Sequence, residues 1–181
     1  DRIDPKFSLN HYQIEQIKKS PLFHSRINFL TSIQAKKAIL DETFEPYFSK
    51  LQAREITTFV QQQSPIKIDS ARKFAREKFS SAVLEFSEKE RKIITFVTNK
   101  TNNWLRKNKI NLMANHPWRF IKIQNWLCGG FAHTRGTYII LSQSYLDRLT
   151  KDWSDKMSKK TEASLITALG GLLVHEQLHS L

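Results

Sequence analysis

The residues with the clearest chemical potential stand near the end of the chain, at His175, Glu176 and His179. They form an H-E-x-x-H sequence, in which the two histidines are four residues apart. On an α-helix this spacing places both imidazoles on one face, one turn apart. Two neutral imidazoles in this arrangement can bind one Zn²⁺ through ring nitrogens at about 2.0–2.1 Å. Glu176 is offset toward the place of a metal-bound water, from which its carboxylate can take a proton.

The residues before this motif predict the helix that it needs. From Leu165 to Val174 the sequence is apolar on nearly every side of a helix, and Glu176 is the only charged residue from Ala163 to Leu181. We therefore expect a buried helix whose last turn carries the motif, with Thr161 as its N-cap. The competing interpretation is a pair of core histidines beside a solvated glutamate. It is disfavoured because burying these polar groups without partners costs free energy.

Two segments upstream of this helix carry strand patterns. Residues 118–124 alternate large apolar and polar side chains, and residues 137–141 are β-branched, aromatic and apolar. Gly136 marks a turn before the second segment, and Ser142 or Ser144 can cap a short helix after it. A small sheet is therefore expected beside the H-E-x-x-H helix. Two adjacent glycines inside that helix, at 170 and 171, indicate that another element approaches it closely.

Helical patterns dominate the chain before residue 110. They cover residues 11–19, 27–40, 45–62 and two consecutive stretches in the middle third of the chain. Asp69 or Ser70 can cap the first of those two helices, and Ser87 with Glu90 forms a capping box for the second. We expect the aromatic and aliphatic stripes of these two helices to pack together as an antiparallel pair.

The last ten residues, Leu172–Leu181, resemble the extended signature of the zincin metallopeptidases. In that signature, uncharged and hydrophobic residues surround H-E-x-x-H. Here Gln177 and Ser180 are uncharged, and Leu181 fills a hydrophobic position. The order of elements over residues 130–181 also resembles that of small bacterial zincins, whereas the first hundred residues resemble no known family.

This resemblance implies a zinc-dependent peptidase that acts on a peptide or protein substrate. His175 and His179 would be metal ligands, and Glu176 would be general base and then general acid. A third protein ligand is expected downstream of His179, beyond Leu181. Residues 111–181 would then be the front part of a catalytic core that is truncated at its C-terminus.

The resemblance also indicates where a substrate would bind. Small zincins pair an extended peptide with the edge of a strand that precedes the H-E-x-x-H helix, and residues 137–141 match that position. Thr137, Tyr138 and Ile139 are therefore candidate substrate-binding residues. The Tyr138 hydroxyl could also contact an oxyanion, although a packed aromatic side chain is the preferred interpretation. His133 lies just before this strand and could polarise a substrate carbonyl, although an ordinary loop histidine fits the same sequence.

Together these observations predict an α+β protein. A mostly helical portion over residues 1–110 would join residues 111–181, with the small sheet and the buried H-E-x-x-H helix, in one continuous domain. Two alternatives remain open. One is a catalytically inactive or regulatory zincin-like domain, and the other is a basic helical nucleic-acid-binding module with a chance motif.

Charge and composition narrow the possible partners. The chain has 29 Lys and Arg against 17 Asp and Glu, a net charge of +12, to which residues 66–110 contribute +7. Such a surface can attract polyanions, yet no P-loop, zinc-finger or RNP-like motif accompanies it, so nucleic acid is not the expected partner. No apolar run approaches the ~20 residues of a membrane span, and the single cysteine, Cys128, excludes an intrachain disulfide. The basic charge and the peptidase hypothesis weakly favour an exported bacterial protein. The sequence does not indicate an oligomeric state.

Overall fold

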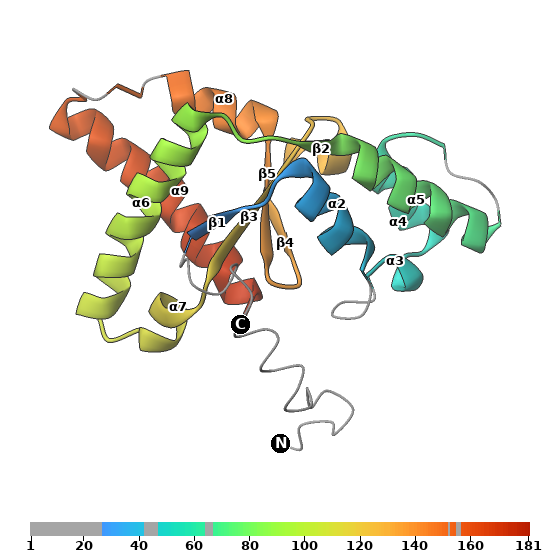
Figure 1. Cartoon of the computed structure of the whole chain (residues 1–181), viewed down its shortest axis with the longest axis horizontal. Helices are drawn as coiled ribbons and strands as arrows, with labels where there is room; N and C mark the ends of the chain where they lie inside the picture. The colour runs from blue at the N-terminus through green and yellow to red at the C-terminus, as the bar shows by residue number, and fades with distance from the viewer. Residues whose placement is uncertain (1–26, 42–46, 64–66, 152, 155–156) are drawn as a thin grey trace, which may run out of the picture.

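The computed structural model describes residues 27–41, 47–63, 67–151, 153–154 and 157–181. Its elements, in chain order, are β1 (Ile27–Phe29), α2 (Ser32–Leu40), α3 (Tyr47–Lys50), α4 (Ala53–Val60), α5 (Ile68–Ala82), β2 (Val83–Leu84), α6 (Glu88–Lys107), α7 (Asn111–Asn115), β3 (Trp118–Ile123), η3 (Leu127–Gly130), β4 (His133–Arg135), β5 (Tyr138–Ser142), α8 (Gln143–Lys151) and α9 (Lys159–His179). Helices surround a small mixed sheet, so the predicted α+β class is confirmed (Figure 1). The helix predicted over residues 11–19 lies outside the described residues.

The sheet has five strands within the described part of the chain. Its main path runs β1-β3-β5-β4, and β2 also pairs with β3. Strands β1, β3 and β5 are parallel, whereas β4 is antiparallel to β5 and forms one edge. Because β1 and β2 precede residue 110, the sheet joins the mostly helical portion to the rest of the chain. Residues 137–141, expected at the edge, contribute to the inner strand β5 instead, so this expectation is wrong.

Strand β3 lies between two hydrophobic cores, and its side chains point alternately into one and the other. Trp118 and Phe120 face the cluster that contains α6, α7, α8 and α9. Ile121 and Ile123 face the other cluster, with α2, α3, α4 and α5. Figure 1 shows these two groups of helices on opposite sides of the sheet. Helices α5 and α6 therefore belong to different cores, and the expected packing of these two helices against each other is wrong.

Capping residues in the sequence correctly predicted the starts of two helices, α6 and α8. Ser87 caps α6, where its Oγ accepts from the Glu90 N–H at 3.3 Å and the Glu90 carboxylate accepts from the Ser87 N–H at 2.7 Å. This is the predicted capping box. At the start of α8, Ser142 Oγ accepts from the Tyr145 N–H at 3.3 Å. Strand β3 agrees with the alternation seen over residues 118–124.

Other boundaries differ from the predictions. The helix predicted over residues 27–40 begins only at Ser32, because residues 27–29 pair with β3 as a strand. The helix predicted over residues 45–62 is divided into α3 and α4, since Gln52 is extended and starts a new helix with a capping box to Glu55.

The N-caps of two further helices also differ. Helix α5 starts after Lys67, ahead of the expected caps Asp69 and Ser70. Helix α9 starts after Ser158, whose hydroxyl accepts from the Thr161 N–H at 3.1 Å, so Thr161 lies inside the helix.

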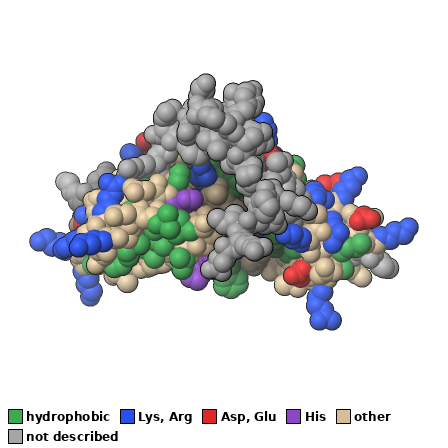
Figure 2. Space-filling model, turned by 90° about the horizontal axis from the view of Figure 1, so that it is seen from below, with side chains coloured by type: hydrophobic (Ala, Val, Ile, Leu, Met, Phe, Trp, Pro, Cys, Tyr) green, Lys and Arg blue, Asp and Glu red, His purple; other side chains and the backbone are tan. Residues whose placement is uncertain are grey.

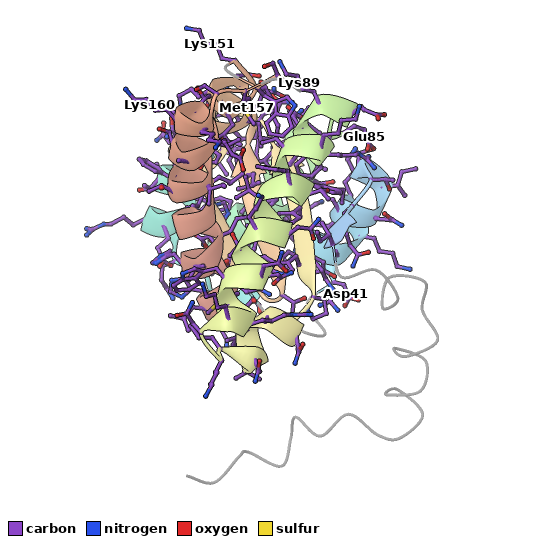
Figure 3. The ribbon with its side chains drawn as sticks, turned by 90° about the vertical axis from the view of Figure 1, so that its left-hand side faces the viewer. Asp41, Glu85, Lys89, Lys151, Met157 and Lys160 are labelled. Carbon is purple, nitrogen blue, oxygen red and sulfur yellow. The ribbon has the colours of Figure 1, made fainter. Side chains whose placement is uncertain are left out.

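Helix α9 is buried on one side and exposed on the other. Its leucines at 165, 169 and 173 are at most 9% exposed and pack in the core beside α6 (Figure 3). The outer face carries exposed small residues, namely Ala163, Ser164, Thr167, Ala168 and Gly171. The expectation of a helix buried on nearly every side is therefore wrong. Neither α9 nor any other described helix is long and apolar enough to cross a membrane.

One of the two glycines in α9 marks a close contact, as expected. A Cβ atom on Gly170 would lie 3.2 Å from Thr101 Oγ1 and 3.7 Å from Val97 Cγ1, both on α6. The missing side chain therefore lets α6 approach α9 closely. A Cβ on Gly171 would meet nothing within 4 Å.

A buried ion pair ties the start of α6 to β3. Lys122 Nζ lies 2.9 Å from Glu90 Oε2 and 3.0 Å from Oε1, and the two side chains are 6% and 4% exposed. The same ammonium donates to the Glu85 carbonyl oxygen at 3.0 Å. All three N–H donors of the lysine thus have acceptors, which offsets the cost of burying its charge.

Lys122→Met should destabilise the fold strongly, because the Glu90 carboxylate would stay buried without its counter-ion. The free energy of unfolding from urea denaturation should fall by about 3 kcal/mol. Lys92→Met is the matched control, since Lys92 pairs with Glu88 at 3.6 Å on the exposed surface of α6. Its effect should stay within about 0.5 kcal/mol, and equal losses in the two variants would contradict the assignment.

Candidate functional site

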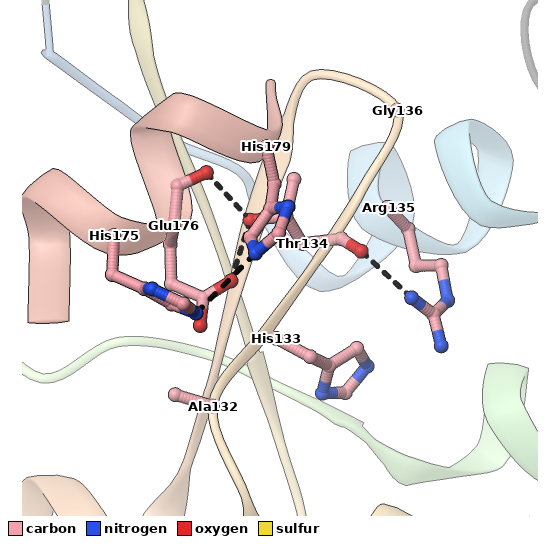
Figure 4. Close-up of a pocket in the computed structure, with 8 residues that line it drawn as sticks. All are labelled: Ala132, His133, Thr134, Arg135, Gly136, His175, Glu176 and His179. Atoms are coloured by element: carbon pink, nitrogen blue, oxygen red, sulfur yellow. Dashed lines mark hydrogen bonds between the residues drawn. The ribbon is translucent and has the colours of Figure 1, made fainter. Parts of the chain in front are cut away.

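His175 and His179 extend from the last turn of α9 into solvent. Their Nε2 atoms are 3.3 Å apart, and the rings meet edge to face with centroids 4.8 Å apart (Figure 4). Both side chains are exposed. The four-residue spacing thus brings the two ring nitrogens together, as helix geometry predicts.

This separation suits two ligands of one tetrahedral zinc ion. Bonds of about 2.0–2.1 Å at the tetrahedral angle place two ligand nitrogens roughly 3.3–3.4 Å apart. The Nε2 atoms of His175 and His179 already have this spacing, so the two residues fit as ligands. The same spacing lets one neutral imidazole donate a hydrogen bond to the other. Within the described residues no group of three His, Cys, Asp or Glu could hold a metal, and the third ligand expected beyond Leu181 stays a prediction.

Glu176 lies on the inner side of the same helix turn and is held by the edge strand. Its side chain is 4% exposed. Thr134 Oγ1 lies 2.7 Å from Glu176 Oε2 and 2.9 Å from the Glu176 backbone oxygen (Figure 4). The single proton of this hydroxyl is donated to one of these two oxygens or shared between them, so Thr134 holds the carboxylate close to the backbone of the turn. The sequence did not indicate Thr134, because a single threonine in a short strand forms no pattern.

An open cleft of about 600 Å³ is lined by β4 and by the end of α9, which touch each other through Thr134 and Glu176. Its lining residues are Ala132, His133, Thr134, Arg135, Gly136, His175, Glu176 and His179. Gly136, with φ of 53°, starts the two-residue turn that joins β4 to β5, as the sequence predicted. A side chain at this φ would be strained, so the glycine is needed to fold β4 back along β5.

Most basic side chains of the described residues lie away from this cleft. Figure 2 shows Lys and Arg toward the two ends of the molecule, with exposed histidine and hydrophobic side chains between them. Lys89, Lys151 and Lys160 gather at one end of the α6–α9 layer (Figure 3). Because Lys160 is in the first turn of a 21-residue helix, it lies roughly 30 Å from the turn that carries His179. Arg135 is the only Lys or Arg among the described residues that line the cleft.

Arg135 lines the cleft and stacks on Tyr47. Its guanidinium carbon lies 4.1 Å from the centroid of the Tyr47 ring, and NH2 donates to the Tyr47 hydroxyl at 3.0 Å. NH1 donates to the Thr134 carbonyl oxygen at 2.8 Å. Nε is buried and has no hydrogen-bond partner among the described residues. The neighbours thus orient the Arg135 side chain but do not satisfy all of its hydrogen-bond donors.

His133 lines the cleft but points to the opposite face of β4 from Thr134. Its Nδ1 is 3.0 Å from the Phe131 carbonyl oxygen, and its Nε2 is 3.8 Å from Cys128 Sγ. Burial lowers the pKa of His133 to about 4, against the effect of the Phe131 hydrogen bond, and the charge of Arg135 adds to the lowering. Burial also raises the pKa of the Cys128 thiol to about 12, which disfavours a thiolate.

The other predicted substrate-binding residues lie on the β4–β5 turn and the inner strand. Thr137 Oγ1 accepts a hydrogen bond from Arg119 NH1 at 2.8 Å. Tyr138 is half-buried, and burial raises the pKa of its hydroxyl. Ile139 is fully buried in the core. Their assignment depended on an edge position for this segment, and that position belongs to β4.

Comparisons of this chain with protein families, curated proteins and solved structures find no match. The resemblance to zincins stays a prediction that rests on the sequence of the H-E-x-x-H turn and its surroundings. Any chemistry of the candidate site therefore has to follow from the geometry of its residues, which are His175, Glu176, His179 and Thr134.

The lowered pKa of the half-buried His133 predicts a loss of stability in mild acid. Its pKa is about 4 in the folded state against 6.5 ordinarily. Above pH 6.5 the imidazole is neutral in both states. As the pH falls from 6.5 toward 4, the unfolded chain binds a proton that the folded chain does not, so the free energy of unfolding decreases.

Thermal unfolding midpoints of His133→Phe should accordingly fall less steeply with pH than those of the wild type. Midpoints at about pH 8, where the imidazole is neutral in both states, isolate the effect of the substitution itself. Parallel curves for the two proteins down to about pH 4 would contradict a lowered pKa of His133 in the folded state.

Proposed function

We propose that this protein is a zinc-dependent peptidase whose H-E-x-x-H turn hydrolyses peptide bonds. The observation that carries the proposal is the pair of Nε2 atoms 3.3 Å apart on the same helix turn as a buried carboxylate. This turn borders an open cleft and an edge strand, where a peptide has room to bind. The likeness of residues 130–181 to zincins supports the same chemistry.

His175 and His179 supply two nitrogen ligands from one rigid element. When bound, zinc lowers the pKa of a water molecule and polarises the carbonyl group of the scissile bond. The helix holds both imidazoles at ligand spacing, so little ordering is needed when the ion binds. The third ligand predicted downstream of His179 would complete the set.

Glu176 acts as general base and then as general acid in this proposal. Its carboxylate takes a proton from the water that attacks the carbonyl carbon. It then gives this proton to the amine nitrogen as the C–N bond breaks. Thr134 binds Oε2 at 2.7 Å, which leaves Oε1 to contact the water.

Strand β4 provides the binding edge. Its outer side has no partner strand within the described part of the chain. An extended peptide can therefore join the sheet through main-chain hydrogen bonds. Since Thr134 is the middle residue of β4 and contacts Glu176, a peptide bound there would pass beside the carboxylate. The substrate position is thus β4, next in space to the segment that the sequence indicated.

Glu176→Gln should separate metal binding from hydrolysis. The full-length variant should hold one zinc per chain, measured by plasma mass spectrometry. Its hydrolysis of casein, followed by the release of free amines, should fall by about 10²–10⁴-fold. His175→Ala should lose both zinc and activity, because one ligand is removed.

His116→Ala is the matched control for these variants. His116 follows α7 and does not line the cleft, so this variant should keep both zinc and activity. Near-normal hydrolysis by Glu176→Gln would exclude Glu176 as the base. A wild-type protein without stoichiometric zinc would overturn the metallopeptidase proposal as a whole.

Thr134→Val should lower kcat by about 10–100-fold while zinc content and KM stay close to those of the wild type. The substitution keeps the shape of the side chain but removes the hydroxyl that orients the Glu176 carboxylate. Thr134→Ser retains the hydroxyl and should recover most of the rate. Steady-state kinetics on a single peptide decides this, and equal kcat values for the Val variant and the wild type would remove Thr134 from the mechanism.

A further inference from the structure

We propose that Arg135 makes the cleft selective for peptides with an acidic side chain beside the bond that is cut. This inference rests on the proposed function, because it takes the substrate to bind along the free edge of β4. It adds a substrate class, acidic peptides, and the residue that recognises it.

The pleat of β4 determines which substrate side chains Arg135 can reach. Thr134 faces α9, as its contact with Glu176 requires. His133 and Arg135 pair with Ile140 and Tyr138 and point to the other face, so the Arg135 side chain extends away from the two histidines of α9 (Figure 4). Directly paired residues of neighbouring strands share a face. In a peptide paired with β4, one residue would lie opposite Thr134. The side chain of the next residue would point toward Arg135.

The Arg135 guanidinium is prepared to bind a carboxylate. Its two hydrogen bonds, to the Thr134 carbonyl and the Tyr47 hydroxyl, leave one N–H on NH1 and one on NH2 without a partner among the described residues, whereas the unpaired N–H of Nε is buried. The ring of Tyr47 supports the plane of the fork from one side. Because the fork is already held in place, a carboxylate would bind it with little loss of side-chain freedom.

On the face of β4 that carries Arg135, away from Glu176, the charges favour an anionic group. The ion pairs of the described residues involve other side chains, and none places a carboxylate within 4.0 Å of Arg135. The charge of Glu55 contributes to the raised pKa of Tyr47, and the Glu55 carboxylate accepts a hydrogen bond from the Gln52 N–H at 2.7 Å. The neighbouring His133 is half-buried, and desolvation lowers its pKa to about 4, so it is neutral near pH 7. A glutamate or aspartate side chain would therefore gain a counter-ion, whereas a lysine would be repelled.

Binding can be measured apart from hydrolysis in the Glu176→Gln protein. Fluorescein-labelled peptides rich in Ala and Ser would carry one Glu or one Gln, moved along the peptide one position at a time. In fluorescence anisotropy titrations, one register of the Glu peptide should bind about tenfold more tightly than its Gln partner. The preference should shrink as the salt concentration rises.

Substitutions at position 135 test whether this preference comes from the guanidinium. Adding Arg135→Gln to Glu176→Gln should equalise the two peptides, and adding Arg135→Glu should favour a Lys peptide in the same register. Arg135→Lys keeps the charge without the fork and should retain a smaller preference. Arg148→Gln on α8, outside the cleft, is the matched control and should leave the preference unchanged.

Each result decides the inference. Equal affinity for the Glu and Gln peptides, or binding of neither, would overturn it, as would a preference that survives Arg135→Gln. If Arg135→Gln fails to fold by circular dichroism, the comparison of Glu, Gln and Lys peptides in the Arg135→Lys protein serves instead. Loss of the proposed function shows separately, as absent zinc or absent casein hydrolysis in the wild type, and a charge preference in binding would still support recognition by Arg135.

Discussion

The hydroxyl of Thr134 joins the edge of the sheet to the last turn of α9, and the candidate site lies where these two elements meet. It contacts both the backbone oxygen and the carboxylate of Glu176. Helix α9 reaches this point because its leucine stripe packs in the core and Gly170 lets α6 approach. Strand β4 reaches it because the turn at Gly136 returns the chain along β5. A slip of one residue in β4 would turn Thr134 to the other face and leave the carboxylate without this partner.

The helical part of the site could be predicted because its information is local. A four-residue spacing is enough to bring His175 and His179 to one face, and the Ser87–Glu90 capping box likewise needs only residues one turn apart. The order of strands in a sheet depends on residues far apart in sequence. The pattern of residues 137–141 therefore predicted a strand correctly, but its place between β3 and β4 depended on partners that the pattern does not specify.

Short elements carried too little pattern to be recognised. Strand β4 has three residues, which cannot establish an alternation, so no strand was predicted there. The apolar residues of β1 fit either a helical or a strand period until pairing with β3 selects the strand. At the start of α9, Ser158 and Thr161 are both good caps, and their hydroxyl oxygens lie 2.9 Å apart. Propensity alone therefore could not decide which of the two precedes the helix.

The alternation of side chains in β4 separates two tasks along three consecutive residues. Thr134 faces α9 and orients the carboxylate, whereas Arg135 faces Tyr47 and presents its guanidinium on the other side of the strand. His133 shares that second face, but burial keeps it neutral, so the positive charge there belongs to Arg135. A peptide added to this edge would inherit the same alternation. Two neighbouring side chains of the peptide would then contact opposite faces of the sheet, one beside α9 and the other beside Arg135. A substitution of Arg135 that changes which peptide side chain is preferred would therefore leave the contact between Thr134 and Glu176 in place.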